Sequence, residues 1–223
     1  FSGSHKAAIN KGVHAMKERN SEIWQVPYLP IDPADIGREY EPIVRINSQS
    51  GKGGIQYVLD TYFGLKLPKS FLVNFLPYIK SETDSKNIEL TPQQVFDLFD
   101  KTFINVYNPY ELISFREISH DKKFAAVEAV IKKDNVETTI QGTGKGLLDA
   151  FVNAFTSETG INFSINMYNE HAMKSGTDST AITYIEIIKD NSKKIHLGAG
   201  VSSSVTKSSI RAIITAVNRM ITE

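Results

Sequence analysis

The sequence predicts an α+β protein in which mainly helical segments are followed by a domain of two strand-strand-strand-helix repeats. Two observations support this prediction. Apolar residues recur at helical spacing up to about Glu111, where short segments of alternating polarity, typical of strands, begin. In addition, the glycine pairs Gly142–Gly144 and Gly198–Gly200 each follow a predicted third strand and precede a predicted helix. This recurrence indicates an internal duplication.

The composition is that of an ordinary globular protein. The chain has 223 residues, 41% hydrophobic and 22% charged, enough for one large domain or two small ones. The 25 basic and 25 acidic residues cancel, so we expect neither a nucleic-acid nor an anionic-membrane partner. No apolar run approaches the length of a membrane span. The absence of cysteine excludes disulfides and cysteine-ligated metal sites.

The first part of the chain is expected to be mostly helical. Ser4 can cap a helix that runs to about Lys17. The proline-spaced stretch 27–33 must be extended or turning, and Asp32 followed by proline is a helix-start signal. Residues 51–54 are glycine-rich and predict a loop, and residues 55–59 predict a short strand or a buried segment.

Two further helices are expected before the strands begin. Ser70 starts one of them, in which Pro77 can introduce a bend. The polar stretch 81–87 predicts a surface loop. Thr91, followed by proline and two glutamines, resembles a capping box at the start of the next helix.

The second part of the chain predicts two similar units. The predicted strands cover residues 112–119, 124–132, 136–141, 161–167, 181–188 and 194–197. Each third strand is followed by a glycine turn and then by an apolar helix. Because one unit cannot cover its own sheet face, we expect the two units to pack around a shared core.

The turn 142–146 is the best candidate for ligand binding on local grounds. Glycines between a strand and a helix leave backbone N–H groups open, and a helix N-terminus favours an anion. A tight turn that needs positive φ explains the same glycines equally well. The other glycine-rich stretch, 48–54, lacks phosphate-loop spacing, so a connector is expected there.

The histidines predict no metal site. His14, His120, His171 and His196 are widely separated and form no i, i+4 pair. Taken alone, His5 reads as a surface or capping residue.

Three stretches, 1–12, 24–40 and 45–54, resemble in this order the part of 2-isopropylmalate synthases that follows their catalytic barrel. The likeness continues through residues 142–220, including Ser208–Ala212. It implies an acyltransferase that condenses acetyl-CoA with 2-oxoisovalerate in leucine biosynthesis, and a chain that, lacking the barrel, is inactive alone. The divalent metal of this family (zinc, magnesium or manganese) is expected in that barrel, and no cofactor is expected in this chain.

The resemblance implies a catalytic role for His5 and Tyr28. In this chemistry a proton leaves the methyl group of acetyl-CoA, and the resulting enolate attacks a ketone. A group that titrates near neutrality can shuttle the proton, and a phenol can hydrogen-bond a developing oxyanion. Which group is the base stays open. The family arrangement places this segment over the barrel of the partner subunit, which implies a homodimer.

The resemblance also implies a site for the inhibitor L-leucine in the duplicated domain. The positions that match it are Gly144, Lys145, Gly146, Ala150, Tyr168, Ala172, Asp178 and Ser179. The leucine carboxylate would meet the helix N-terminus, and the two alanines would leave space for the isobutyl group. Two departures from the family pattern, Lys145 with Leu147 and the hydroxyl of Ser179, leave the identity of the inhibitor open.

The expected organisation is a helical linker subdomain over residues 1–50, a second linker subdomain over 51–108, and the duplicated regulatory domain over 109–223. A cytoplasmic location is expected, or an organellar one in a eukaryote. Three alternatives stay open: a citramalate or homocitrate synthase, a non-enzymatic amino-acid sensor, and an unrelated α+β interaction module. Residues 1–54 count against a sensor, which has no use for a segment that caps a barrel.

Overall fold

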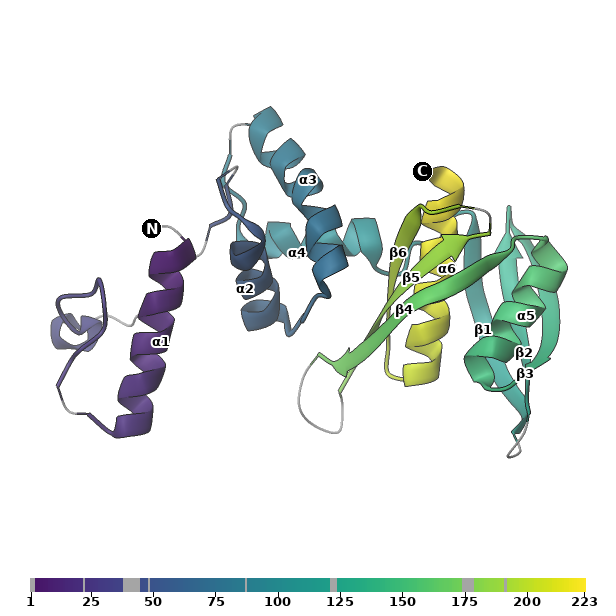
Figure 1. The fold of residues 1–223 in the computed structure, drawn as a ribbon, viewed down its shortest axis with the longest axis horizontal. Coiled ribbons are helices and arrows are strands. Elements are labelled where there is room, and N and C mark those ends of the chain that lie inside the picture. Colours follow the sequence, from purple (N-terminus) through teal and green to yellow (C-terminus); the bar gives the residue numbers. More distant parts are fainter. Residues whose placement is uncertain are drawn as a thin grey trace.

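The computed structural model of the chain describes residues 3–21, 23–37, 45–47, 49–86, 88–120, 124–173, 179–190 and 192–223. It confirms the α+β class: helices occupy the first half, and two three-stranded antiparallel sheets with their helices occupy the second (Figure 1). No helix in the described part of the chain is long and apolar enough to cross a bilayer.

The N-terminal segment contains α1 (Gly3–Arg19) and the short 3-10 helix η1 (Pro33–Ile36). Both were predicted. Asp32 caps η1 as expected, because its carboxylate accepts the backbone N–H of Ala34 at 3.0 Å. In Figure 1, α1 and the segment that follows it lie at one end of the molecule, beside the other helices.

Helix α2 (Lys52–Phe63) replaces the loop and short strand predicted for residues 51–59, so that prediction was wrong. Gly51 is the N-cap, and the following glycines form the first helical turn. The buried side chains Ile55, Val58 and Leu59 have the i, i+3, i+4 spacing of a helix face. Only the expectation of burial was correct.

Helices α3 (Lys69–Lys86) and α4 (Pro92–Phe103) complete the helical part. The surface loop predicted from residue 81 is wrong, since α3 continues to Lys86; residue 87 lies outside the described residues. Within this last part of α3 the buried Thr83 hydroxyl is satisfied by the Ile79 carbonyl, to which it donates at 2.9 Å. The capping box at Thr91 is confirmed, with both reciprocal hydrogen bonds to Gln94.

The second half is two copies of a βββα unit, as predicted. The elements are β1 (Tyr110–His120), β2 (Ala125–Lys133), β3 (Val136–Gly144) and α5 (Leu147–Thr159), then β4 (Phe163–Ala172), β5 (Ala181–Lys189), β6 (Ile195–Ser202) and α6 (Val205–Thr222). The sheets have the orders β1-β2-β3 and β4-β5-β6, and every pairing is antiparallel. Apolar side chains of both units share one core cluster, which confirms the expected packing.

The two glycine pairs are not turns, and this corrects the prediction. Gly142–Gly144 are the last residues of β3, Gly198–Gly200 lie inside β6, and none of these glycines has positive φ. They allow close helix packing instead. A Cβ on Gly142 would lie 2.5 Å from the Ala150 carbonyl oxygen, and one on Gly198 would lie 2.3 Å from that of Ala212. The same contact in both units also supports the duplication.

A second core cluster joins the helical part to one of the sheets. Strand β5 is buried on both faces: Ile185 and Ile187 belong to the core shared with α6, whereas Ile182 and Tyr184 pack with α2, α3 and α4. Ile46 also belongs to this second cluster and bridges to Leu90. The predicted domain boundaries at 50/51 and 108/109 stay predictions.

Candidate functional site

His5 and Tyr28 lie together, although they come from different elements. Their ring centroids are 4.4 Å apart, with an edge-to-face angle of 78° between the planes. His5 is on the first turns of α1, and Tyr28 is in the turn that follows α1. Tyr28 is 56% exposed, so more than half of its surface is accessible to solvent. The pair offers an imidazole and a hydroxyl at one accessible surface.

This arrangement can transfer a proton to or from a molecule bound beside it and can hydrogen-bond that molecule. An imidazole can accept or return a proton near neutral pH, and a phenol can donate a hydrogen bond to an oxygen that gains negative charge. Two such groups in ring contact can reach the same small ligand.

The first group of predicted leucine-site residues lies where β3 leads into α5. Gly146 is the N-cap of α5, and Lys145 is exposed. The Lys145 backbone N–H donates to the carboxylate of Asp149 at 2.8 Å, so an acidic side chain already lies at this helix N-terminus. Ala150 is fully buried in the shared core, and Gly144 packs against its backbone nitrogen.

The second group lies on β4 and at the start of β5. Tyr168 is 41% exposed, and its hydroxyl lies 3.0 Å from the hydroxyl of Ser209 and also donates to Glu170. Burial is the main reason that the pKa of Tyr168 lies above its usual value, and the Glu170 carboxylate adds to it. Ala172 ends β4 and is exposed, and Ser179 precedes β5. The predicted ligand Asp178 lies outside the described residues.

The structure therefore distributes the predicted leucine residues over two neighbouring places. Gly144 is the last residue of β3, and Lys145, Gly146 and Ala150 follow at the beginning of α5, whereas Tyr168 contacts the beginning of α6. In Figure 1 the N-terminal ends of both helices and the end of β4 lie toward the same edge of the duplicated domain.

Ser208, Ser209 and Thr183 are polar residues of this region that the sequence prediction did not assign to the site. They are almost fully buried, and the Thr183 hydroxyl lies 2.7 Å from that of Ser208 and 3.3 Å from that of Ser209. The signal for them was present, because two adjacent serines interrupt an otherwise apolar helix face. Together with Tyr168 they form a chain of hydroxyls between β4, β5 and α6.

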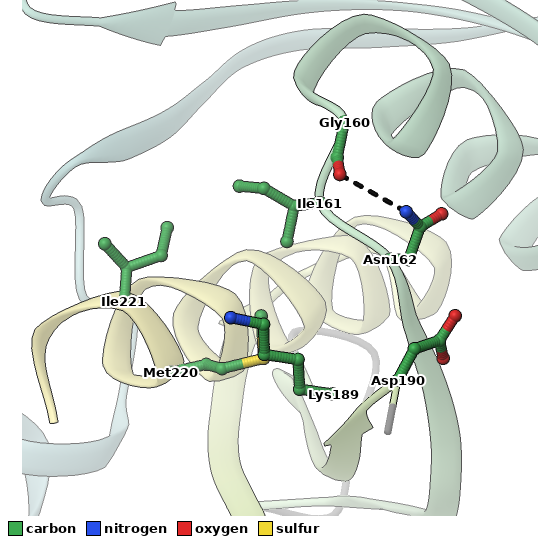
Figure 2. Close-up of a pocket in the computed structure, with 7 residues that line it drawn as sticks. All are labelled: Gly160, Ile161, Asn162, Lys189, Asp190, Met220 and Ile221. Atoms are coloured by element: carbon green, nitrogen blue, oxygen red, sulfur yellow. Dashed lines mark hydrogen bonds between the residues drawn. The ribbon is translucent and has the colours of Figure 1, made fainter. Parts of the chain in front are cut away.

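The duplicated domain also has a pocket of about 470 Å³ at the opposite, C-terminal ends of α5 and α6 (Figure 2). Figure 2 shows the Lys189 side chain extending across Met220 toward Ile221. On the other side, the Asn162 amide donates to the Gly160 carbonyl at 3.3 Å. None of the residues predicted to bind leucine lines this pocket, so it is not the predicted site.

No metal site is evident in the part of the chain that the structure describes. There, no three histidine, aspartate or glutamate side chains are grouped so that they could hold an ion.

Two family models match the chain. Residues 1–60 match the alpha-isopropylmalate synthase post-catalytic domain-like family, and residues 89–221 match the LeuA allosteric (dimerisation) domain. By these matches, the duplicated βββα domain falls in an allosteric-domain family and the helical N-terminal segment in a post-catalytic one. The chain belongs to the family of LeuA allosteric (dimerisation) domains.

Curated relatives agree with this assignment. The chain is 40% identical to the 2-isopropylmalate synthase of Clostridium acetobutylicum over 98% of its own length and 40% of the relative's. It is 41% identical to the enzyme of Mesorhizobium japonicum over 99% of its length, covering 40% of that protein. The chain thus spans about 40% of the length of the curated relatives that it matches.

Proposed function

We propose that this chain is the post-catalytic part of a 2-isopropylmalate synthase, an acyltransferase that condenses acetyl-CoA with 2-oxoisovalerate. The observation that carries the proposal is the identity of 40% or more to enzymes of that name over nearly the whole chain. The match of residues 1–60 to a post-catalytic family supports an enzyme over a free-standing sensor. On this proposal the isolated chain does not catalyse the condensation.

His5 and Tyr28 are proposed to act in that reaction. Their ring contact at 4.4 Å supports a joint role in moving the acetyl-CoA proton and stabilising the oxyanion that follows. The exposure of Tyr28 leaves the pair accessible to a catalytic domain. Because the family is named for dimerisation, we propose a homodimer in which the pair serves the partner subunit.

Steady-state kinetics of the full-length enzyme tests this role. His5→Ala and Tyr28→Phe should each lower kcat by on the order of 10²-fold while changing KM less, because general acid–base groups act on the transition state. His14→Ala is the matched control, since His14 lies on the same helix and is exposed. Turnover near that of the wild type in both variants would remove the pair from the mechanism.

The duplicated domain is proposed to bind L-leucine as a feedback inhibitor. The proposed ligands are Gly144, Lys145, Gly146, Ala150, Tyr168, Ala172, Asp178 and Ser179. The allosteric family name and the partly exposed Tyr168 hydroxyl support this assignment. The N-terminus of α5, where Gly146 supplies no side-chain cap, suits the leucine carboxylate. The Asp149 carboxylate, which already accepts the Lys145 N–H, suits the leucine ammonium group.

Calorimetric titration of this chain with leucine, isoleucine and lysine tests the inhibitor. Heat with leucine alone supports the proposal, whereas a preference for isoleucine would indicate a citramalate synthase. Tyr168→Phe and Asp149→Asn should weaken leucine binding, and Tyr107→Phe, an exposed tyrosine outside the proposed site, should not. No heat with any of the three amino acids would contradict leucine binding.

The remaining parts of the proposal concern the whole enzyme. A divalent metal ion (zinc, magnesium or manganese) is proposed for the catalytic domain, and a cytoplasmic location for the protein. Removal of metal from the full-length enzyme should abolish its turnover. The heat of leucine binding to the same metal-free enzyme should not change.

A further inference from the structure

The contact between His5 and Tyr28 is the last of several contacts along one face of α1. His5, Gly12 and Met16 lie at helical spacing on this face. The segment 24–29 runs along it in the opposite direction. The Gln25 backbone N–H lies 3.3 Å from the Met16 sulfur, Val26 and Pro27 lie at Gly12, and Tyr28 lies at His5.

At Gly12 this segment packs closely against the helix. A Cβ at Gly12 would lie 2.6 Å from the Pro27 Cδ and 3.3 Å from the Val26 Cγ1. A real side chain there would push the segment outward, because a contact at 2.6 Å lies well inside van der Waals distance. Val26 is 6% exposed, and Ile9, at helical spacing from His5 and Gly12, only 2%, so apolar side chains on this side of α1 are shielded from solvent.

Trp24 closes the turn that carries Tyr28. Its indole N–H donates to the Leu29 carbonyl at 2.7 Å, and the Leu29 N–H donates to the Val26 carbonyl at 3.3 Å. Between these bonds Tyr28 has φ of +65°, a left-handed conformation that is uncommon for a residue with a side chain. Such a conformation persists where the surrounding contacts hold it.

We propose that Gly12 and Trp24 are positioning residues that hold the Tyr28 ring against His5. Gly12 provides the bare helix surface on which Pro27 rests, and Trp24 fixes the turn so that Tyr28 points back along α1. A glycine inside a helix lowers helix stability, so Gly12 is explained by this contact and not by the helix. The proposal rests on the catalytic role proposed for the pair, but its geometry can be tested separately.

Proton NMR of this chain tests the geometry. Wild-type protein should show nuclear Overhauser effects between the His5 and Tyr28 rings and a hydrogen-bonded indole N–H of Trp24, the only tryptophan. Gly12→Ala should remove the ring–ring signals, while circular dichroism shows helix content retained, because alanine is the better helix former. The control Gly53→Ala has open space for its Cβ and should leave these signals unchanged.

A compensating variant separates positioning from general damage. The atom that collides with a Cβ at Gly12 is the Pro27 Cδ, which alanine lacks. Gly12→Ala combined with Pro27→Ala should therefore recover ring–ring signals that Gly12→Ala alone loses. Trp24→Phe should weaken the same signals, because it keeps an aromatic side chain but removes the indole N–H that bonds the Leu29 carbonyl. Ring–ring signals that persist unchanged in Gly12→Ala would overturn the proposal.

Kinetics of the full-length enzyme distinguishes this proposal from the catalytic one. If both hold, Gly12→Ala lowers kcat by on the order of 10²-fold, as expected for a displaced catalytic group, and the Gly12→Ala, Pro27→Ala pair restores part of it. If Gly12→Ala separates the rings but turnover stays at the wild-type level, the positioning role stands and the catalytic role of the pair fails.

Discussion

Two glycines at the start of α5 show how neighbouring residues of one type can have different tasks. A Cβ on Gly144 would lie 2.4 Å from the Ala150 nitrogen and 2.7 Å from the Asp149 carbonyl carbon, whereas a Cβ on Gly146 meets nothing within 4 Å. The first glycine is needed for close packing of strand and helix. The second is an N-cap in extended conformation, which other residues can adopt.

The comparison of Gly144→Ala with Gly146→Ala tests this difference. Gly144→Ala should lower the free energy of unfolding by about 1–3 kcal/mol, because backbone atoms must move. Gly146→Ala should cost less than about 1 kcal/mol. Urea denaturation of both variants measures the two values, and equal values would mean that close packing is not what requires Gly144.

We expect His196 to make the stability of the chain depend on pH. It is 5% exposed, its Nδ1 lies 3.4 Å from the Glu223 carboxylate, and Lys194 and Arg219 also act on it. Burial, followed by the charge of Lys194, holds the pKa of His196 below its usual value of 6.5, although Glu223 opposes this. Between the folded pKa and 6.5 the unfolded chain therefore binds more protons than the folded one.

The free energy of unfolding should therefore not be reduced by His196 above pH 6.5. It should decrease as the pH falls below 6.5, because the unfolded chain then binds the proton more tightly. Thermal melts between pH 7.5 and about 5 should show this decrease, and His196→Gln should make the dependence shallower. The exposed His14→Gln provides the comparison. An unchanged pH profile in His196→Gln would show that other groups control it.

At the level of elements, the sequence predicted segments well where the periodicity was strong and failed where glycine or polarity was taken as a stop signal. Residues 52–54 and 81–86 are helical, because apolar positions nearby, such as Ile55, Val58 and Ile79, fit the buried face of each helix. The glycines of β6 were read as its end, although they lie within the strand. A glycine that only allows a helix to approach cannot be told from a turn glycine by sequence alone.

For the candidate sites, too, some residues could be predicted from the sequence and others could not. The pairing of His5 with Tyr28 came from family resemblance, because no local pattern links residues joined through a turn. The hydroxyls of Ser208, Ser209 and Thr183 come together only through the packing of α6 on β5. Periodicity predicts which face of an element is buried, but it does not predict which neighbour that face meets.

The turn between α2 and α3 docks on the end of β4. Gly64 has φ of +68°, and a Cβ there would lie 2.0 Å from the Met173 carbonyl oxygen. Beside it, the Lys66 N–H donates to the Nε2 of His171 at 3.2 Å, and the same nitrogen lies 3.4 Å from the buried Tyr184 hydroxyl. This contact joins the helical part to the strand that carries Tyr168 and Ala172.

Gly64→Ala should disrupt this docking. Gly37→Ala is the matched control, since Gly37 has φ of +67° but nothing within 4 Å of a Cβ. Both variants carry the strain of a left-handed alanine, so Gly64→Ala should lower the free energy of unfolding by about 1 kcal/mol or more beyond the control. Equal losses in denaturant unfolding would mean that the turn adjusts without cost.

At the scale of the whole molecule, the sheet β4-β5-β6 belongs to two cores, whereas β1-β2-β3 belongs to one. In β5 six consecutive residues from Ile182 to Ile187 are buried, whereas burial alternates along β2. Large apolar residues occur on both faces of this run, alongside the buried Thr183 and Glu186, and this pattern indicates a strand covered on both sides. The sequence carried this signal, but only the structure identifies the cover as α2, α3 and α4.

This double burial predicts that the duplicated domain does not stand alone. The outer face of its second sheet carries Ile182, Tyr184, Leu197 and Ala199, which are all nearly inaccessible in the full chain. A chain of residues 109–223 would expose this patch, and exposed apolar patches of that kind promote association. It should therefore bind a hydrophobic dye and aggregate on size-exclusion chromatography, unlike the full chain.

One substitution should be favourable in the chain of residues 109–223 and unfavourable in the full chain. Ile182→Thr places a hydroxyl on the outer face, so in residues 109–223 it should reduce dye binding and aggregation. In the full chain the same change buries that hydroxyl among α2, α3 and α4 and removes apolar contacts, which should cost about 1–3 kcal/mol of stability. If Ile182→Thr reduced aggregation of residues 109–223 and left the full chain as stable as before, the helical part would not cover this sheet in solution. Reduced aggregation of residues 109–223 together with lower stability of the full chain would show that the helical part and the duplicated domain fold as one unit. Ligand binding at β4 can then affect the linker through this unit.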